Sequence, residues 1–185
     1  MPQEKRVLLE KQDIVRTVAR MAHEIVEKAA GPGGLVLIGI RSRGVHLARR
    51  LARKIEEFSS PAPSIGAIDV SRYRDDRTQS EASANVSRSE ILVTVDEKTV
   101  VLVDDVIFRG RTIRAAMQAV NQLGQPTRIL LAVLVDRGAR ELPIRADIVG
   151  KNIEANDSQR VNVLLEESDG IDQVILSQWD TRSKI

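Results

Sequence analysis

The feature of this sequence that most constrains its fold is a set of short runs made almost wholly of aliphatic residues. These runs are LVLIGI at residues 35–40, VVLV at 100–103 and ILLAVLV at 129–135. Short apolar runs without polar alternation are typical of parallel strands that are covered on both faces. Because aromatic residues make up only 2% of the chain, the core must be built from Val, Ile, Leu and Ala. We therefore expect an α/β fold with a mostly parallel sheet.

Segments with apolar residues at helical spacing alternate with these runs. They predict helices over residues 13–30, 44–58 and 112–123. Further strands are predicted at residues 64–73, 90–95, 146–153, 161–167 and 173–179. The alternation indicates a single domain over residues 1–185, with a doubly wound sheet and flanking helices. The strand at 90–95 lies close enough to the one at 100–105 for the two to pair across the turn DEKT.

One polar segment interrupts this pattern at residues 72–89, RYRDDRTQSEASANVSRS. It has almost no large apolar residue and no periodicity, so it cannot bury itself. We expect a flexible loop inside the domain, which the residues alone leave open as a functional lid or a dispensable insertion.

Composition excludes several classes of function. The chain has no cysteine, which rules out disulfides and thiol catalysis. It has no apolar run of membrane-spanning length and no signal-peptide pattern, so we expect a cytoplasmic protein without a membrane partner. The net charge of +2 says little about partners, although arginines cluster near residues 41–54 and 137–145. Any single one of them is most simply a solvated surface residue.

Polar residues follow four of the apolar runs, at residues 41–44, 69–73, 104–112 and 136–138. Ligands of open parallel sheets bind outside the carboxyl ends of the strands, so these segments are the candidate site. The alternative, that they are ordinary polar loops, is weakest for the third segment, where two consecutive acids follow four apolar residues.

That third segment belongs to the stretch VLVDDVIFRGRT. Gly110 allows a close backbone approach, and Thr112 stands where a helix N-cap is expected, so that loop amides and the helix N-terminus can hold an anion. Asp104 and Asp105 suit a pair of hydroxyls, as on a ribose. The residues together predict a pocket for a ribose 5-phosphate, the alternative being that the two acids only cap the loop.

The stretch VVLVDDVIFRGRT closely resembles the phosphoribosyl pyrophosphate (PRPP) motif of type I phosphoribosyltransferases. The segments RMAHEIVE, LIGIRSRGVHLARRLA, IDVSRYRDD and LAVLVDRGARELPIRADIVGKNI together resemble the pyrimidine operon regulators of the PyrR family. The resemblance extends roughly over residues 6–167. It implies the type I phosphoribosyltransferase fold, in a protein that both binds RNA and makes UMP and pyrophosphate from uracil and PRPP.

The resemblance also implies roles for individual residues. Asp104 and Asp105 are expected to hold the ribose hydroxyls, with Asp105 assisting deprotonation of uracil, and residues 72–89 to form a hood that closes over the site. Mg²⁺ is expected to be bound through the pyrophosphate rather than by a protein cage. The 5-phosphate is assigned to Phe108, Arg109, Gly110, Arg111 and Thr112, the pyrophosphate to Arg41, Ser42, Arg43 and Gly44, and the base to Val135, Asp136 and Arg137.

One residue departs from the phosphoribosyltransferase pattern. Most members of the superfamily have a small hydroxyl residue, usually threonine, just before the glycine of the motif, where this chain has Arg109. Arginine is bulky and charged, and it can either point away or contact the phosphate itself. The transferase activity is therefore less firmly implied than the fold and the nucleotide pocket.

The RNA surface implied by the resemblance consists of basic residues from two segments. The implied partner is a hairpin of pyrimidine-operon mRNA, bound in a UMP- or UTP-dependent way by at least a homodimer. Two alternatives stay open: a nucleotide-sensing RNA-binding regulator without transferase activity, and a salvage phosphoribosyltransferase without an RNA role. The implied RNA contacts are Arg20, His23, Arg140, Arg145 and Lys151.

Overall fold

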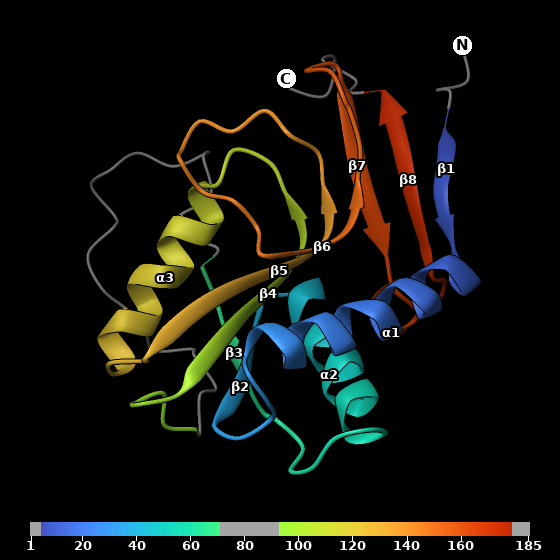
Figure 1. Ribbon diagram of the computed structural model, residues 1–185. Helices are drawn as coiled ribbons and strands as arrows, with labels where there is room; N and C mark the ends of the chain where they lie inside the picture. Colours follow the sequence, from blue (N-terminus) through green and yellow to red (C-terminus); the bar gives the residue numbers. More distant parts are fainter. Residues whose placement is uncertain (1–4, 71–92, 179–185) are drawn as a thin grey trace.

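The computed structural model describes residues 5–70 and 93–178, and its centre is a five-stranded parallel sheet (Figure 1). The strand order is β3-β2-β4-β5-β6, and every neighbouring pair is parallel. The expected mostly parallel α/β sheet is thus confirmed. The strands are β2 (Leu35–Ile40), β3 (Ser64–Ile68), β4 (Thr99–Ile107), β5 (Arg128–Asp136) and β6 (Ile148–Asn152).

Helices cover both faces of this sheet. Helices α1 (Lys11–Lys28) and α2 (Arg43–Glu56) lie on one face, and α3 (Arg111–Leu123) lies on the other. Leu37 and Val101 belong to the core under α1 and α2, whereas Ile38 and Leu102 belong to the core under α3. Successive strand residues are therefore buried on opposite faces, which explains why these strands show no polar alternation. No helix in the described ranges is long and apolar enough to cross a membrane.

A second, antiparallel sheet stands beside the first (Figure 1). Its order is β1-β8-β7, from β1 (Arg6–Glu10), β8 (Gln173–Gln178) and β7 (Gln159–Leu164), with the short helix α4 (Glu166–Asp169) between β7 and β8. Val161, Val163 and Val174 join the core under α1 and α2. The two C-terminal strands were predicted, but their separation into another sheet and the strand at β1 were not.

The predicted pairing of residues 90–95 with β4 is wrong. Residues 93–95 lie outside any strand, and β4 pairs in parallel with β2 on one edge and β5 on the other. A central strand has no free edge for a hairpin partner. Val95 is instead fully buried in the core under α3, and Asp96 accepts a hydrogen bond from the Gln125 amide at 2.6 Å.

The polar segment at residues 72–89, predicted as a flexible hood, lies outside the described residues.

Candidate nucleotide-binding site

The strand order places a topological switch between β2 and β4. From β2 the chain passes through α2 to β3 on one side, and from β4 it passes through α3, on the opposite face, to β5 on the other side. Ligands of doubly wound sheets bind in the crevice at such a point, outside the carboxyl ends of the strands. Two of the four predicted polar segments lie at this point. Residues 41–44 follow β2, and residues 104–112 include the end of β4 and the loop after it. The structure thus brings together the predicted pyrophosphate and ribose-phosphate segments.

The segment after β2 packs closely against the ends of β2 and β4. A Cβ atom on Gly44 would lie 2.3 Å from the Val103 carbonyl oxygen of β4, and one on Gly39 would lie 2.4 Å from Cα of Val45. Backbone atoms cannot move aside as a flexible side chain can, so glycine is required at both places. Arg41 and Ser42 are exposed at the tip of this turn, and the peptide bond between them is cis.

Asp104 and Asp105 lie within β4, not after it, because the strand continues to Ile107. Asp104 is only 8% exposed, and Asp105 is half-buried. The Asp105 amide donates to Asp104 Oδ1 at 3.0 Å, and the Val106 amide donates to Asp105 Oδ1 at 2.9 Å.

The loop between β4 and α3 has the features of an anion site. Gly110 adopts a φ of 92° and is the residue from which α3 begins, so the prediction of Thr112 as the N-cap is wrong: Thr112 lies inside the helix. A left-handed backbone favours glycine over threonine, which places the N-cap at Gly110, two residues before Thr112. The first turn of α3 carries no acidic residue, and its amides have no partner within the helix. A phosphate fits there.

Arg109 is paired with a carboxylate that the sequence analysis did not single out. Its Nε lies 3.1 Å from Glu141 Oε1, while Arg111 Nη2 lies 2.6 Å from Glu141 Oε2. The Glu141 amide also donates to the Arg109 carbonyl at 3.1 Å. One carboxylate therefore holds both arginines of the predicted phosphate loop, and it comes from the segment after β5.

At the end of β5, Arg137 stacks on the phosphate loop. Its guanidinium carbon lies 3.8 Å from the centre of the Phe108 ring, its Nη2 donates to the Asn156 carbonyl at 3.1 Å, and it is only 8% exposed. Burial lowers the pKa of this guanidinium. Its Nε is buried without a hydrogen-bond partner among the described residues. Val135 is fully buried, and Asp136 accepts a bond from the Gly138 amide at 2.9 Å.

Arg140, predicted to contact RNA, directs its donors into the protein. Its Nη1 donates to the Phe108 carbonyl at 2.8 Å and to the Gly138 carbonyl at 3.0 Å. Its Nε donates to the Ile144 carbonyl at 3.1 Å, and its Nη2 pairs with Asp136. The side chain is 19% exposed. A change at Arg140 is thus expected to disturb the phosphate loop as well as any RNA contact, so this residue cannot separate the two functions.

The other predicted RNA contacts are exposed. Arg20 donates to the Val149 and Gly150 carbonyls of β6 at 2.9 and 2.7 Å, which brings it beside Lys151. His23, three residues further along α1, stacks on the ring of Phe58, with 3.9 Å between ring centres.

The fourth exposed contact, Arg145, lies apart from these three. It borders a cavity of about 230 Å³ that is also lined by Ile113 and Met117 of α3. The structure thus joins three of the five residues at α1 and β6.

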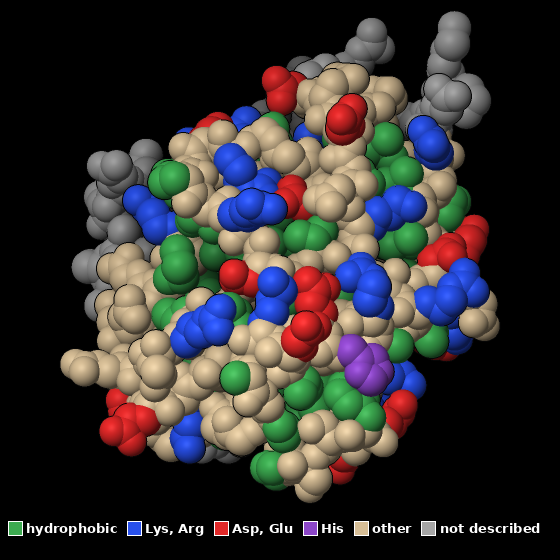
Figure 2. Space-filling model, viewed as in Figure 1, with side chains coloured by type: hydrophobic (Ala, Val, Ile, Leu, Met, Phe, Trp, Pro, Cys, Tyr) green, Lys and Arg blue, Asp and Glu red, His purple; other side chains and the backbone are tan. Residues whose placement is uncertain are grey.

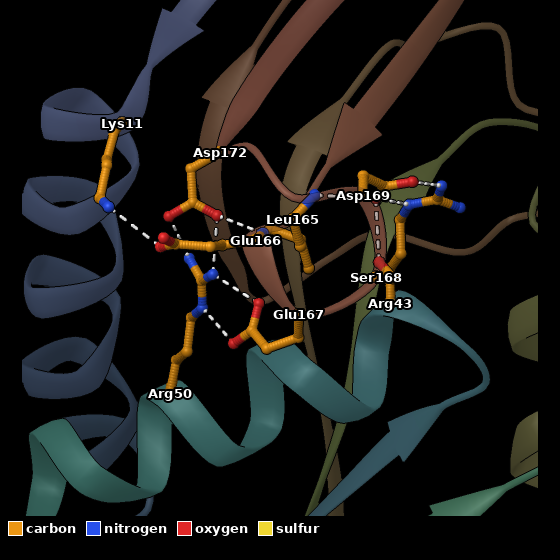
Figure 3. Close-up of polar contacts among 9 residues, drawn as sticks. All are labelled: Lys11, Arg43, Arg50, Leu165, Glu166, Glu167, Ser168, Asp169 and Asp172. Carbon is orange, nitrogen blue, oxygen red and sulfur yellow. Dashed lines mark hydrogen bonds and ion pairs between the residues drawn. The ribbon is translucent and has the colours of Figure 1, made fainter.

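Arg43, predicted to bind pyrophosphate, is part of an ion-pair network (Figure 3). Its Nε and Nη2 donate to Asp169 of α4 at 3.2 and 2.9 Å. Two turns along α2, Arg50 pairs with Glu167 at 2.6 Å and with the buried Asp172 at 2.7 Å. These pairs hold the segment between β7 and β8 against α2, next to the turn at Arg41 and Ser42 that precedes this helix.

The pKa of Asp169, the acidic partner of Arg43, predicts how the stability of the fold depends on pH. Hydrogen bonds from Arg43 lower the pKa of Asp169 to about 2. A lowered pKa stabilises the fold at pH values above the ordinary pKa of about 4, and this contribution is lost as the pH falls towards 2. We expect the difference in unfolding free energy between the wild type and Asp169→Asn to be largest above pH 4 and to shrink below it. Urea titrations at several pH values test this, and a difference that stays constant down to pH 2 would contradict it.

The described residues contain no cluster of three or more His, Cys, Asp or Glu side chains that could hold a metal ion. Mg²⁺ is commonly held by one or two carboxylates together with substrate phosphates and water. Asp104 and Asp105 provide oxygen donors of that kind beside the proposed phosphate site. The residues present therefore fit a Mg²⁺ ion that arrives with its substrate.

The combination of this sheet, its topological switch point and the glycine-containing loop between β4 and α3 is that of a phosphoribosyltransferase. The phosphoribosyl transferase domain model matches residues 6–167, and the chain belongs to that family. Within it the chain belongs with the PyrR proteins. It is 49% identical to the bifunctional protein PyrR of Pelotomaculum thermopropionicum over 95% of this chain and 97% of that one. It is 52% identical to the Streptomyces coelicolor protein of the same name, over 94% and 90% of the two chains.

Solved structures support the fold. The hypoxanthine phosphoribosyltransferase of Trypanosoma cruzi superimposes with a TM-score of 0.72 at 18% identity, covering 95% of this chain and 97% of that chain. A hypoxanthine phosphoribosyltransferase from Staphylococcus aureus gives a TM-score of 0.67 at 19% identity, covering 96% and 93%. The fold is therefore shared well beyond the close relatives.

Proposed function

We propose that this protein is a pyrimidine-operon regulator that binds mRNA in response to UMP or UTP and also converts uracil and PRPP into UMP and pyrophosphate. The observation that carries the proposal is that the residues predicted to bind the ribose phosphate lie at the β2–β4 switch point, in a chain about half identical to proteins named bifunctional PyrR. We further propose that it acts in the cytoplasm as a homo-oligomer of at least two chains.

The transferase reaction replaces pyrophosphate by uracil at the anomeric carbon of the ribose. The amides of the Gly110 turn and α3 hold the 5-phosphate, while Asp104 and Asp105 hold the ribose hydroxyls and favour the positive charge that develops on the ring. Arg41 and the turn after β2 face the leaving pyrophosphate. When bound, Mg²⁺ supplies neutralisation of the pyrophosphate charge. The protein thus acts chiefly by positioning and electrostatic stabilisation.

The arrangement of Arg109 bears on whether the transferase works. Its guanidinium pairs with Glu141, so this side chain need not occupy the place of a phosphate. We therefore favour the bifunctional reading over a pure nucleotide sensor. Formation of labelled UMP from labelled uracil and PRPP, measured over a range of Mg²⁺ concentrations, decides between them. If no UMP forms at any concentration, the protein is a nucleotide sensor without transferase activity.

The proposed RNA surface lies at the junction of α1 and β6, where Arg20 donates to the Gly150 carbonyl beside Lys151 and His23 lies three residues further along the helix. Figure 2 shows basic and acidic side chains interspersed across the face viewed in Figure 1, without segregation into one broad basic patch. Such a surface favours recognition of a defined RNA structure over general attraction to phosphate. Phe58, under the ring of His23, adds an aromatic surface of the kind on which unpaired bases stack.

A titration with a hairpin from a pyrimidine-operon leader, with and without UMP, tests the regulatory role. Tighter binding with UMP is expected, whereas a plain salvage enzyme would bind the hairpin weakly and without regard to UMP.

Removal of the Lys151 charge gives a sharper prediction. Lys151→Gln is expected to weaken hairpin binding at all UMP concentrations and to lower the slope of log affinity against log salt by about one, because one phosphate contact is lost. Lys28→Gln, at the far end of α1, is the charge-matched control and should leave the slope as it is. An unchanged slope for Lys151→Gln would remove this residue from the RNA surface.

A further inference from the structure

The segment between β5 and β6, residues 137–147, is attached to the phosphate loop at residues 108–110 by several independent contacts. Arg140 donates to the Phe108 carbonyl, and the Glu141 amide donates to the Arg109 carbonyl. The side chains of Leu142 and Ile144 come within about 3.6 Å of the position that a Cβ atom on Gly110 would take. The two loops therefore form one packed unit, although about 30 residues separate them in the sequence.

Charge adds to this attachment. Glu141 is a single carboxylate shared by Arg109 and Arg111, both of which belong to the loop and helix start where the phosphate is proposed to bind. A phosphate held by the neighbouring loop amides brings negative charge close to this cluster, which repels Glu141 and attracts the two arginines without displacing them from it. Its arrival must therefore alter the forces on Glu141, and with them those on residues 137–147.

The same segment leads to the proposed RNA surface. Arg145 is an exposed residue of this segment. The segment continues directly into β6, which contains Lys151 and accepts the hydrogen bonds of Arg20. A displacement at Glu141 can thus reach exposed basic residues along a short and continuous piece of chain. No rearrangement of the sheet is required.

We propose that Arg140 and Glu141 are positioning residues that couple nucleotide binding to RNA binding through residues 137–147. This inference rests on the proposed function, and it says which residues transmit the effect of bound UMP to the RNA surface. Arg140 ties the segment to the phosphate loop in both states. Glu141 senses the phosphate through Arg109 and Arg111.

The test measures hairpin affinity with and without UMP and takes the ratio of the two values. Coupling of this kind typically amounts to roughly 5- to 150-fold. In Glu141→Gln, which keeps the shape of the side chain but removes its charge, we expect the ratio to fall close to one. A uniform loss of affinity cancels in the ratio, so a purely structural weakening does not imitate the result. Glu154→Gln, an exposed residue after β6, is the matched control and should keep the wild-type ratio.

Hydrogen exchange without RNA gives a second readout. UMP is expected to slow exchange of the amides of residues 138–145 in the wild type and to slow it less in Glu141→Gln. A wild-type hairpin affinity that ignores UMP would overturn the proposed regulation and this coupling with it. A wild-type ratio that survives in Glu141→Gln, with unchanged exchange protection, would overturn the coupling alone.

Discussion

Asp105→Asn is expected to lower kcat/KM for UMP formation by roughly 10²-fold or more, the range typical of a lost general base or charge-stabilising group. Asp105 lies near the end of β4 and is half-buried, and its Oδ1 accepts the Val106 amide. Asparagine has the same shape and can keep that hydrogen bond. The expected loss therefore arises from charge and proton acceptance and not from misfolding.

Steady-state kinetics with labelled uracil measure this effect. The thermal midpoint of Asp105→Asn should stay near that of the wild type, and Glu27→Gln, an exposed carboxylate on α1, serves as the control for loss of one negative charge. If Asp105→Asn turns over at the wild-type rate, the carboxylate has no part in the reaction.

Arg50→Met is expected to lower the free energy of unfolding by about 3 kcal/mol or more, because removal of one partner leaves a buried charge without compensation. Arg50 is 18% exposed, and the side chain of its partner Asp172 is 3% exposed. Glu167, whose pKa Arg50 lowers, loses its partner as well. The network that these residues form in Figure 3 holds the segment between β7 and β8 on α2.

Urea unfolding measures the loss, with Lys54→Met as the control. Lys54 lies on the same helix and pairs with Glu57, but the two side chains are 35% and 61% exposed, and such surface pairs contribute less than about 1 kcal/mol. Arg50→Lys should recover only part of the loss, because an ammonium group cannot bind two carboxylates in the bidentate manner of a guanidinium. Equal effects of Arg50→Met and Lys54→Met would contradict a buried network.

The long apolar strands were predictable because each is buried on both faces by the α1–α2 and α3 layers. The predicted bounds of β2 at residues 35–40 agree with the structure, and β5 contains the whole apolar run at residues 129–135. The false pairing of residues 90–95 arose because local spacing cannot show that β4 already has partners on both edges. Strand β1 was missed because only Leu9 among its residues is buried.

For the candidate site too, part was predictable from the sequence and part was decided only by the tertiary structure. The sequence itself predicted residues 41–44 and 104–112 as the functional segments, because paired acids and a glycine turn next to buried strands are costly without a ligand. Only the tertiary structure decided what the charged side chains contact. Arg43 meets Asp169, Arg109 meets Glu141, and Arg140 turns inward. These partners come from other loops. Ion pairs depend on the distance between two side chains in space, and the separation of two residues along the chain does not predict that distance.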